Sequence, residues 1–152
     1  WHKSSTGETY EVINPANEEI IGKASKASSK DVDKALLSAQ KGLEVWKKTP
    51  PWQRAYILRR IADKMREKQD ILAKWMTLEV GKPFAEAKGE VNGAADIYEW
   101  NAEETKRIYG QTVESRFEDT RVHVYYQPVG VVAALVPWNF PLVYLQEKFL
   151  QH

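Results

Sequence analysis

Apolar residues recur every three or four positions in four consecutive blocks between residues 29 and 108. That spacing is typical of helices that cover a core with one face. We expect Ser28 or Ser29 to cap the first helix, and the second helix to begin near Pro51. Asp70 is predicted to cap the third helix, and Pro83 to open the fourth. Gly81 is the natural left-handed stop of the third helix, and the fourth runs to about residue 108. The inward positions are Val32, Leu36, Ala39, Leu43 and Trp46; Ala55, Leu58, Ile61, Ala62 and Met65; Ile71, Leu72, Trp75, Met76 and Leu78; and Ala87, Val91, Ala94, Ile97, Tyr98, Ala102 and Thr105.

Two segments on either side of the helical blocks have the pattern of strands. Residues 9–13 and 19–23 flank the turn-forming residues 14–17, which predicts a β-hairpin. Residues 112–114 and 121–126 are rich in β-branched and aromatic side chains and predict two further strands. An uncovered edge of this kind is ready to pair with another chain.

A different pattern occupies residues 131–136, which are six consecutive apolar residues without alternation. This run predicts a strand that is covered on both faces, as in a parallel sheet under helices. Pro137 cannot donate to a ladder and ends the strand, and Pro141 suits the first turn of a helix. Trp138 and Asn139 would lie between them at the carboxyl end of the strand, where open α/β sheets bind ligands.

Asn139 has a possible chemical role at that position. Its side-chain amide could donate to a developing oxyanion, and such a donor can lower a barrier by about 3–4 kcal/mol. The alternative is that Asn139 only satisfies backbone groups in the turn, as Asn often does. The residues alone favour this second interpretation.

Composition and charge narrow the classes of function. The 152 residues fit one domain, with 43% hydrophobic and 28% charged residues. The 22 basic and 21 acidic side chains give a net charge of +1, which provides no reason to expect nucleic acid or a membrane as a partner. The absence of Cys excludes a disulfide scaffold and is compatible with the cytoplasm, where we expect the protein. The three His residues lie far apart, so no metal site is predicted.

Several motifs occur in a fixed order along the chain. They are Asn14-Pro15-Ala16-Asn17, Glu79-Val80-Gly81-Lys82-Pro83, Ala85-Glu86-Ala87-Lys88-Gly89-Glu90, Glu103-Glu104-Thr105-Lys106-Arg107-Ile108-Tyr109-Gly110, and Pro137-Trp138-Asn139-Phe140-Pro141 after Gly130-Val131-Val132. Together they resemble the aldehyde dehydrogenase superfamily over residues 1 to about 143. The third and fourth motifs resemble its succinate-semialdehyde branch most.

The resemblance implies a fold and a set of roles. The fold would be α/β, the N-terminal part of the aldehyde dehydrogenase fold: a β-hairpin, four helices, oligomerisation strands over 111–128 and the first strand of a Rossmann-like sheet. Residues 1–152 would be a truncated cofactor-binding region. Asn139 would stabilise the oxyanion of a thiohemiacetal formed on a catalytic Cys. The nicotinamide side of an NAD or NADP site would be lined by Val136, Pro137, Trp138 and Asn139, and Phe140 would face the aldehyde tunnel.

Other parts of the family's machinery are missing from the sequence. The chain has no Cys, and no nearby residue replaces a thiolate nucleophile. The general-base Glu and the later cofactor loop would lie beyond residue 152. The carboxylates of the fourth helix offer no pair with a distinct catalytic role. We therefore expect the chain alone to bind no cofactor and to be inactive. The resemblance implies that the full-length family oxidises aldehydes to carboxylic acids, and succinate semialdehyde is one candidate substrate here. The alternative is a non-enzymatic assembly module that self-associates or co-oligomerises with an intact relative.

The C-terminal tail departs from the family pattern. Lys148 matches it, whereas Phe149-Leu150-Gln151-His152 does not. A shifted reading frame could restore the family sequence, so one hypothesis is a frameshift; a deliberately shortened chain and a fragment of a longer protein are the alternatives. Without its neighbours, the strand at 131–136 would expose costly apolar surface. We therefore expect self-association, as a homo-oligomer, or rearrangement of the helices.

Overall fold

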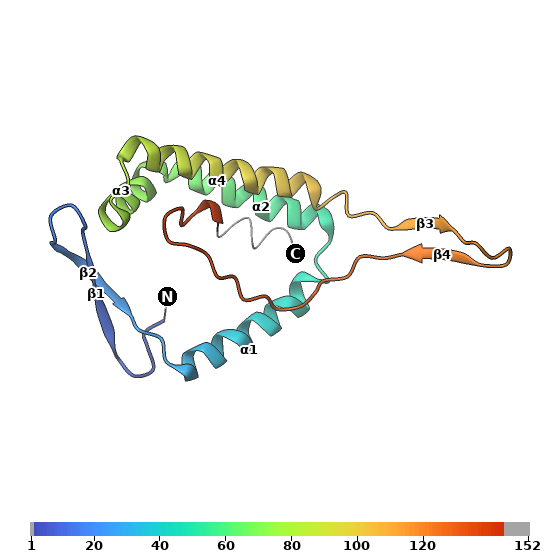
Figure 1. Cartoon of the computed structure of the whole chain (residues 1–152), viewed down its shortest axis with the longest axis horizontal. Coiled ribbons are helices and arrows are strands. Elements are labelled where there is room, and N and C mark those ends of the chain that lie inside the picture. Colours follow the sequence, from blue (N-terminus) through green and yellow to red (C-terminus); the bar gives the residue numbers. More distant parts are fainter. Residues whose placement is uncertain (1, 145–152) are drawn as a thin grey trace.

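The computed structural model describes residues 2–144, and the predicted features of the tail, Lys148 and residues 149–152, lie outside them. The chain is a mixed α/β structure in which four helices are preceded and followed by short strands (Figure 1). In chain order the elements are β1 (Thr9–Ile13), β2 (Ile20–Ser25), α1 (Ser29–Trp46), α2 (Pro51–Glu67), α3 (Gln69–Val80), α4 (Phe84–Glu104), β3 (Gln111–Glu114) and β4 (Arg121–Val124). The predicted fold class and the order of helices and hairpins are confirmed.

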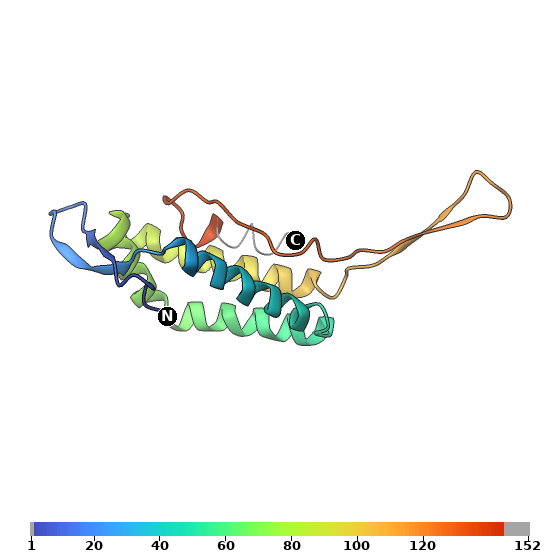
Figure 2. The ribbon, with the colours of Figure 1, turned by 90° about the horizontal axis from the view of Figure 1, so that it is seen from below.

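The core of the described chain lies between α2, α3 and α4. The helices α2 and α4 run side by side in opposite directions, as the two perpendicular views agree (Figures 1 and 2). One apolar cluster joins α2 to α4 through Ala55, Leu58 and Ala102. The other joins α3 to α4 and consists of Ala73, Met76, Ala87 and Val91. The small side chains of α4 allow close approach of the helices, and the predicted stripes of α2 and α4 account for most of this core.

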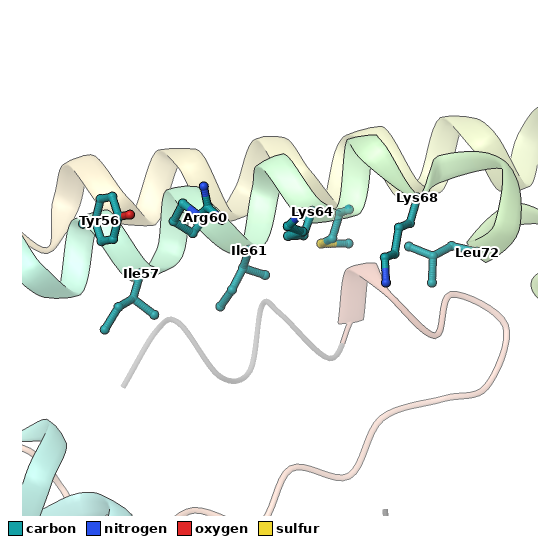
Figure 3. A pocket seen from close by; sticks show the side chains of 8 residues that line it. Tyr56, Ile57, Arg60, Ile61, Lys64, Lys68 and Leu72 are labelled. Carbon is teal, nitrogen blue, oxygen red and sulfur yellow. The ribbon is translucent and has the colours of Figure 1, made fainter.

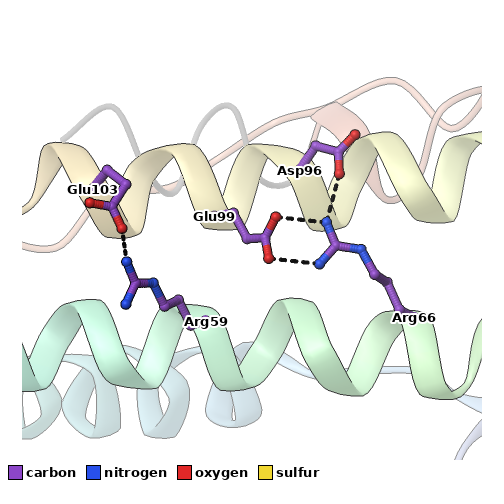
Figure 4. Close-up of polar contacts among 5 residues, drawn as sticks. All are labelled: Arg59, Arg66, Asp96, Glu99 and Glu103. Atoms are coloured by element: carbon purple, nitrogen blue, oxygen red, sulfur yellow. Dashed lines mark hydrogen bonds and ion pairs between the residues drawn. The ribbon is translucent and has the colours of Figure 1, made fainter.

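A row of ion pairs also connects α2 to α4 (Figure 4). Arg66 donates to Glu99 through both terminal nitrogens at 2.8 Å and to Asp96 at 2.7 Å. Earlier on α2, Arg59 pairs with Glu103, which lies further along α4 than Glu99. The pairs lie on the exposed side of the helix interface, where each is worth about 0–1 kcal/mol. They are consistent with a single register of the two antiparallel helices, whose buried contacts are mostly alanines.

Gly81 ends α3 in the left-handed conformation, with φ +77°. The predicted helix stop is therefore confirmed. A Cβ at this position would lie 2.9 Å from Cγ of Pro15 in the β1–β2 turn. The glycine thus serves two purposes, because it closes the helix and lets the N-terminal hairpin approach.

The predicted N-terminal hairpin is present as the two-stranded antiparallel sheet β1–β2. The two further predicted strands pair with each other in a second, separate antiparallel sheet, β3–β4. In β1–β2 the turn is stabilised by Asn14, whose side-chain oxygen accepts from the backbone N–H of Ala16 at 3.0 Å. In β3–β4 Val113 pairs with Val122, and every residue of the two strands is exposed. Figure 1 shows this second hairpin extending away from the helices.

Some predictions about helix ends and faces were wrong. Asp70 does not cap α3, because it lies in the first turn and pairs with Lys88 at 2.8 Å, and Lys68 occupies the cap. The fourth helix ends at Glu104 rather than near residue 108, since Lys106 and Arg107 donate to carbonyls three residues back and so tighten the last turn.

The apolar stripe of α1 was predicted to face a core, but no residue of α1 is buried. Val32 and Leu36 are 52% and 47% exposed, because α1 lies away from the packed faces of the other helices (Figure 1). On α3, Ile71 and Trp75 are likewise exposed. The periodicity identified helices correctly, but a periodic stripe does not reveal what covers it.

Residues 131–136 do not form the predicted buried strand. Their backbone makes no strand pairing, and Val131, Val132 and Leu135 are 40%, 44% and 94% exposed. A parallel strand needs neighbours to receive its backbone hydrogen bonds. The sheets among residues 2–144 are self-contained hairpins, so none of their strands is placed beside this segment.

Candidate functional site

The predicted site residues lie on a turn that follows the extended segment 131–137. Trp138 and Asn139 begin the turn at residues 138–142, and Leu142 ends it. Leu142 packs against the core cluster of α3 and α4. The site therefore lies between a segment without sheet partners and a residue that is fixed to the helices.

Glu90 holds the end of this turn on α4. Its Oε1 accepts a hydrogen bond from the backbone N–H of Leu142 at 2.9 Å, and its Oε2 pairs with Nζ of Lys82. The side chains of Glu90 and Lys82 are only 2% and 9% exposed. Glu90 is the one buried charged residue in the described part of the chain, and burying a carboxylate is costly unless it is paired and hydrogen-bonded. Both conditions are met here.

The local sequence explains why these two side chains meet. Lys82 follows Gly81, whose left-handed backbone turns the chain from α3 towards α4. Glu90 lies on the same face of α4 as Ala87 and Val91, both fully buried. The first turns of α4 thus present a carboxylate within an otherwise apolar face, next to the cation that the preceding loop supplies.

Phe140, the predicted substrate residue, lies beneath the same cation. Nζ of Lys82 is 3.8 Å from the centroid of the Phe140 ring, within the range of a cation–π interaction. The ring also meets Tyr144 edge to face, with centroids 5.6 Å apart. Phe140 remains 41% exposed, so one part of its ring is held and another is accessible.

Trp138 and Asn139 point outward from this support. Trp138 is 74% exposed, and Asn139 is exposed as well. Among residues 2–144, the side-chain amide of Asn139 makes no hydrogen bond to the turn. Val136 is half-buried and Pro137 exposed. The structure therefore brings the five predicted residues together on one short segment, as their adjacency in the sequence requires.

The residues that sequence reasoning missed are Lys82 and Glu90. Lys82 was only part of a family motif, and Glu90 was one of several unassigned carboxylates on the fourth helix. A signal was present, because Glu90 lies three residues after Ala87 and four before Ala94 in the buried stripe. A charged residue inside an apolar stripe indicates a buried partner.

Shifted pKa values occur at contacts elsewhere in the structure. The hydrogen bonds that Arg66 donates to Glu99 and to Asp96 raise the pKa of Arg66, and the bond from Arg66 lowers the pKa of Glu99. Backbone hydrogen bonds from Ser28 and Ser5 lower the pKa of Asp31. These shifts belong to the α2–α4 interface and to the capping box of α1. In the described range, His, Asp and Glu side chains form no cluster of three that could hold a metal ion.

An open groove runs along α2 on the side that faces the end of the described chain (Figure 3). Ile57, Ile61 and Leu72 contribute its apolar lining, and Arg60 and Lys64 are cationic side chains beside them. The predicted site residues do not line this groove. No helix among residues 2–144 combines the length and the low polarity that crossing a bilayer requires.

Comparison with known proteins gives consistent matches over nearly the whole chain. The family model described as "Aldehyde dehydrogenase family" matches residues 1–151. Glutarate-semialdehyde dehydrogenase of Pseudomonas aeruginosa is 46% identical over 148 residues, which are 97% of this chain and 31% of that protein. Succinate-semialdehyde dehydrogenase [NADP(+)] of Escherichia coli is 45% identical over the same shares.

A solved structure agrees with these sequence matches. The crystal structure of an E. coli NADP dependent enzyme superimposes with a TM-score of 0.94 at 44% identity. The superposition covers 99% of this chain and 31% of the other. The chain thus spans about 31% of the length of the relatives that it matches.

Proposed function

This chain belongs to the aldehyde dehydrogenase family, and we propose that it forms the N-terminal, cofactor-facing part of an NAD(P)-dependent enzyme that oxidises an aldehyde to the carboxylic acid. In this proposal residues 1–152 are the first part of the cofactor-binding region. The side-chain amide of Asn139 donates to the oxyanion that forms when a thiolate attacks the aldehyde. Phe140 contacts the aldehyde.

The observation that supports the proposal most is the attachment of the turn at 138–142 to α4. Leu142 is tied to the buried carboxylate of Glu90, while Asn139, three residues earlier, is exposed. An oxyanion donor must be accessible to substrate and also preorganised, since its benefit depends on paying no reorganisation during the reaction. The exposed amide of Asn139 meets the first requirement, and the anchored backbone at Leu142 supports the second.

The residues present fit one part of a dinucleotide. Trp138 offers an exposed aromatic face and Asn139 an exposed amide, which suit the edge of a planar ring such as nicotinamide, and Val136 and Pro137 add backbone beside them. When bound, that ring would accept the hydride that leaves the carbon of the thiohemiacetal. A glycine-rich turn that would hold the pyrophosphate at a helix N-terminus is not found among the described elements. We therefore expect the chain alone to bind neither NAD nor NADP.

The proposed substrate is a semialdehyde that carries a carboxylate at its far end. Support comes from the relatives, because the two compared above are named for glutarate semialdehyde and succinate semialdehyde. Of these two we propose succinate semialdehyde. The chain alone should be inactive, since it has no Cys to act as the thiolate.

A chimera tests this function. The 148-residue segment that matches the E. coli succinate-semialdehyde dehydrogenase would replace the corresponding part of that enzyme, which keeps its remaining length. We expect the chimera to reduce NADP with succinate semialdehyde and the isolated chain to show no turnover. A folded chimera without activity would contradict the proposal, and so would turnover by the isolated chain.

A second function, assembly, is favoured by the β3–β4 hairpin. Because neighbouring residues of a strand point to opposite faces, the register places Val113, Val122 and Val124 on one face and Thr112 and His123 on the other. The three valines are 45%, 42% and 36% exposed. We propose that this apolar face and the open strand edges pair with a second copy of the chain or with an intact relative, so that 111–128 serves as the oligomerisation segment.

Sedimentation of the purified chain over a range of concentrations tests the assembly function. We expect oligomers that dissociate when Val122 and Val124 are both replaced by Lys, because the charges oppose burial of this face. The matched control replaces Thr112 and His123, on the opposite face, by Lys. A parent chain that stays monomeric at every concentration would contradict pairing with a second copy of the chain.

A cytoplasmic location is also part of the proposal and rests on the sequence prediction. Fractionation of cells that express the chain would test it.

A further inference from the structure

We propose that Lys82 and Glu90 are positioning residues that set the orientation of the Asn139 amide, an inference that rests on the proposed function. Neither side chain is placed to touch the aldehyde, because both are almost fully buried. They act instead on the two residues that frame the end of the turn, Phe140 and Leu142. The proposal therefore concerns the geometry of the donor and not the chemical step itself.

We call the Lys82–Glu90 pair, with its contacts to Phe140 and Leu142, the clamp. Its first part is the Glu90 carboxylate, whose two oxygens bind different groups. One oxygen accepts from the backbone N–H of Leu142 at 2.9 Å, and the other pairs with Lys82. Hydrogen bonds to an ionised acceptor are shorter and stronger than those between neutral groups. Since the bonded group of Leu142 is backbone, the contact fixes the path of the chain.

The second part is the position of the Lys82 ammonium between Glu90 and Phe140. The cation pairs with the carboxylate on one side and lies 3.8 Å from the centre of the Phe140 ring on the other. Phe140 directly follows Asn139 in the sequence. Holding the Phe140 ring in place restricts the backbone positions open to Phe140, and so to the peptide bond that joins it to Asn139.

Glu90 and Lys82 are attached to the packed core of the described chain. Glu90 is flanked on α4 by Ala87, Val91 and Ala94, all 0% exposed. Lys82 follows the left-handed stop at Gly81. Productive geometry requires that a catalytic donor be held to within about 0.5 Å. Contacts from packed helices can hold the turn more closely than the unpaired segment 131–136 can.

The structure offers a matched control for this cluster. Lys88 also pairs with a carboxylate, that of Asp70, and lies 5.7 Å from the ring centroid of Phe84. The chemistry is the same, but the Lys88 and Asp70 side chains are 38% and 74% exposed. Their contacts do not include the turn at 138–142.

The test replaces both members of each pair by apolar residues of similar size. The variant Lys82→Met with Glu90→Leu removes the clamp without leaving a lone buried charge, and such replacements are often neutral for folding. Lys88→Met with Asp70→Leu is the control. Each is made in the chain itself, for hydrogen exchange of the Leu142 amide, and in the chimera, for kcat and KM.

We expect faster exchange at Leu142 in the clamp variant, with unchanged exchange at Met76 in the α3 core. In the chimera kcat should fall by about 10- to 100-fold, because a small misplacement of a catalytic group has an effect of that size. KM for the aldehyde should change little, and the control should match the parent in every measurement. A change confined to KM, or a parental kcat, would overturn the positioning role.

The two measurements separate this inference from the proposed function. An inactive parent chimera counts against the function, and the clamp is then judged by exchange in the chain alone. Unchanged exchange at Leu142 overturns the clamp whatever the chimera does. Faster exchange together with a parental kcat overturns the positioning of Asn139, since the turn would then be loosened without consequence for the donor.

Discussion

The carboxylate of Glu90 accepts a hydrogen bond from the backbone N–H of Leu142 at 2.9 Å, across 52 positions of sequence. The link connects the fourth helix to the segment that carries Asn139. It is made by a side chain that is only 2% exposed and whose charge is balanced by Lys82. The contact is therefore both a feature of the core and the support of the proposed site.

Loss of Lys82 alone should be strongly destabilising. The variant Lys82→Met leaves the buried Glu90 carboxylate without its cation, which typically costs about 3–5 kcal/mol. Lys88→Met breaks an exposed pair with Asp70 and should cost about 0–1 kcal/mol. Urea unfolding of both variants and the parent gives the comparison. Equal free-energy losses in the two variants would show that the Lys82–Glu90 pair does not behave as a buried pair.

Gly81→Ala should destabilise the chain by about 1–3 kcal/mol. The residue adopts φ +77°, and a Cβ there would lie 2.9 Å from Cγ of Pro15. The control is Gly89→Ala in α4, where a Cβ meets no atom within 4 Å; it should stabilise the helix by about 0.5–1 kcal/mol. Thermal or urea unfolding should therefore shift in opposite directions. A shift of both variants in the same direction would contradict the account of Gly81.

The free energy of unfolding should depend strongly on Met76 in the core between α3 and α4, and much less on its neighbour Trp75. Met76 is 5% exposed and belongs to the buried cluster, whereas its neighbour Trp75 is 53% exposed. Met76→Ala should cost about 2–5 kcal/mol through lost burial and a cavity. Trp75→Ala should cost clearly less, although a larger side chain is removed. Urea unfolding that ranks the two in the reverse order would mean that Trp75 is covered in solution.

Stability should depend on pH through Asp31. Backbone hydrogen bonds from Ser28 and Ser5 lower the pKa of this carboxyl in the folded chain. A group with a depressed folded pKa stabilises the fold above its unfolded pKa, near 4 for Asp, and loses that contribution as the pH falls towards the folded pKa. Asp31→Asn should therefore be less stable than the parent at neutral pH, and the difference should shrink below about pH 4.

Unfolding midpoints measured between neutral and acidic pH provide this test. The control is Asp33→Asn, which removes the same charge from α1 two residues further along. Its difference from the parent should be small at every pH. A difference for Asp31→Asn that stays constant across the acidic range would contradict the role of its hydrogen bonds.

Much of the local structure could be predicted from the sequence because local chemistry decides it. The Ser28 cap, the stop at Gly81 and the Asn14 turn each depend on a backbone conformation or hydrogen bond made by that residue type. The exposed face of α1 could not be predicted in the same way. Its stripe indicates a helix with an apolar side, but what covers that side depends on segments remote in sequence.

The position of the candidate site in the sequence could be predicted, but the residues that hold it against the helices could not. Asn139 and Phe140 were found because they are contiguous in a distinctive motif. Glu90 and Lys82 were not, since their meeting with Leu142 depends on how α4 packs and on the path of the chain after residue 137. For the same reason residues 131–136 were assigned to a strand, because an apolar run indicates burial without providing the partner strands.

The most direct test of the account is the turnover number of the Asn139→Ala variant in the chimera, measured with saturating NADP and succinate semialdehyde. Asn92→Ala, which changes an exposed Asn on α4, is the control. If the Asn139 amide stabilises the oxyanion, kcat should fall by about 10²- to 10³-fold relative to that control. A kcat equal to that of the control would contradict the central claim that this turn carries the oxyanion donor.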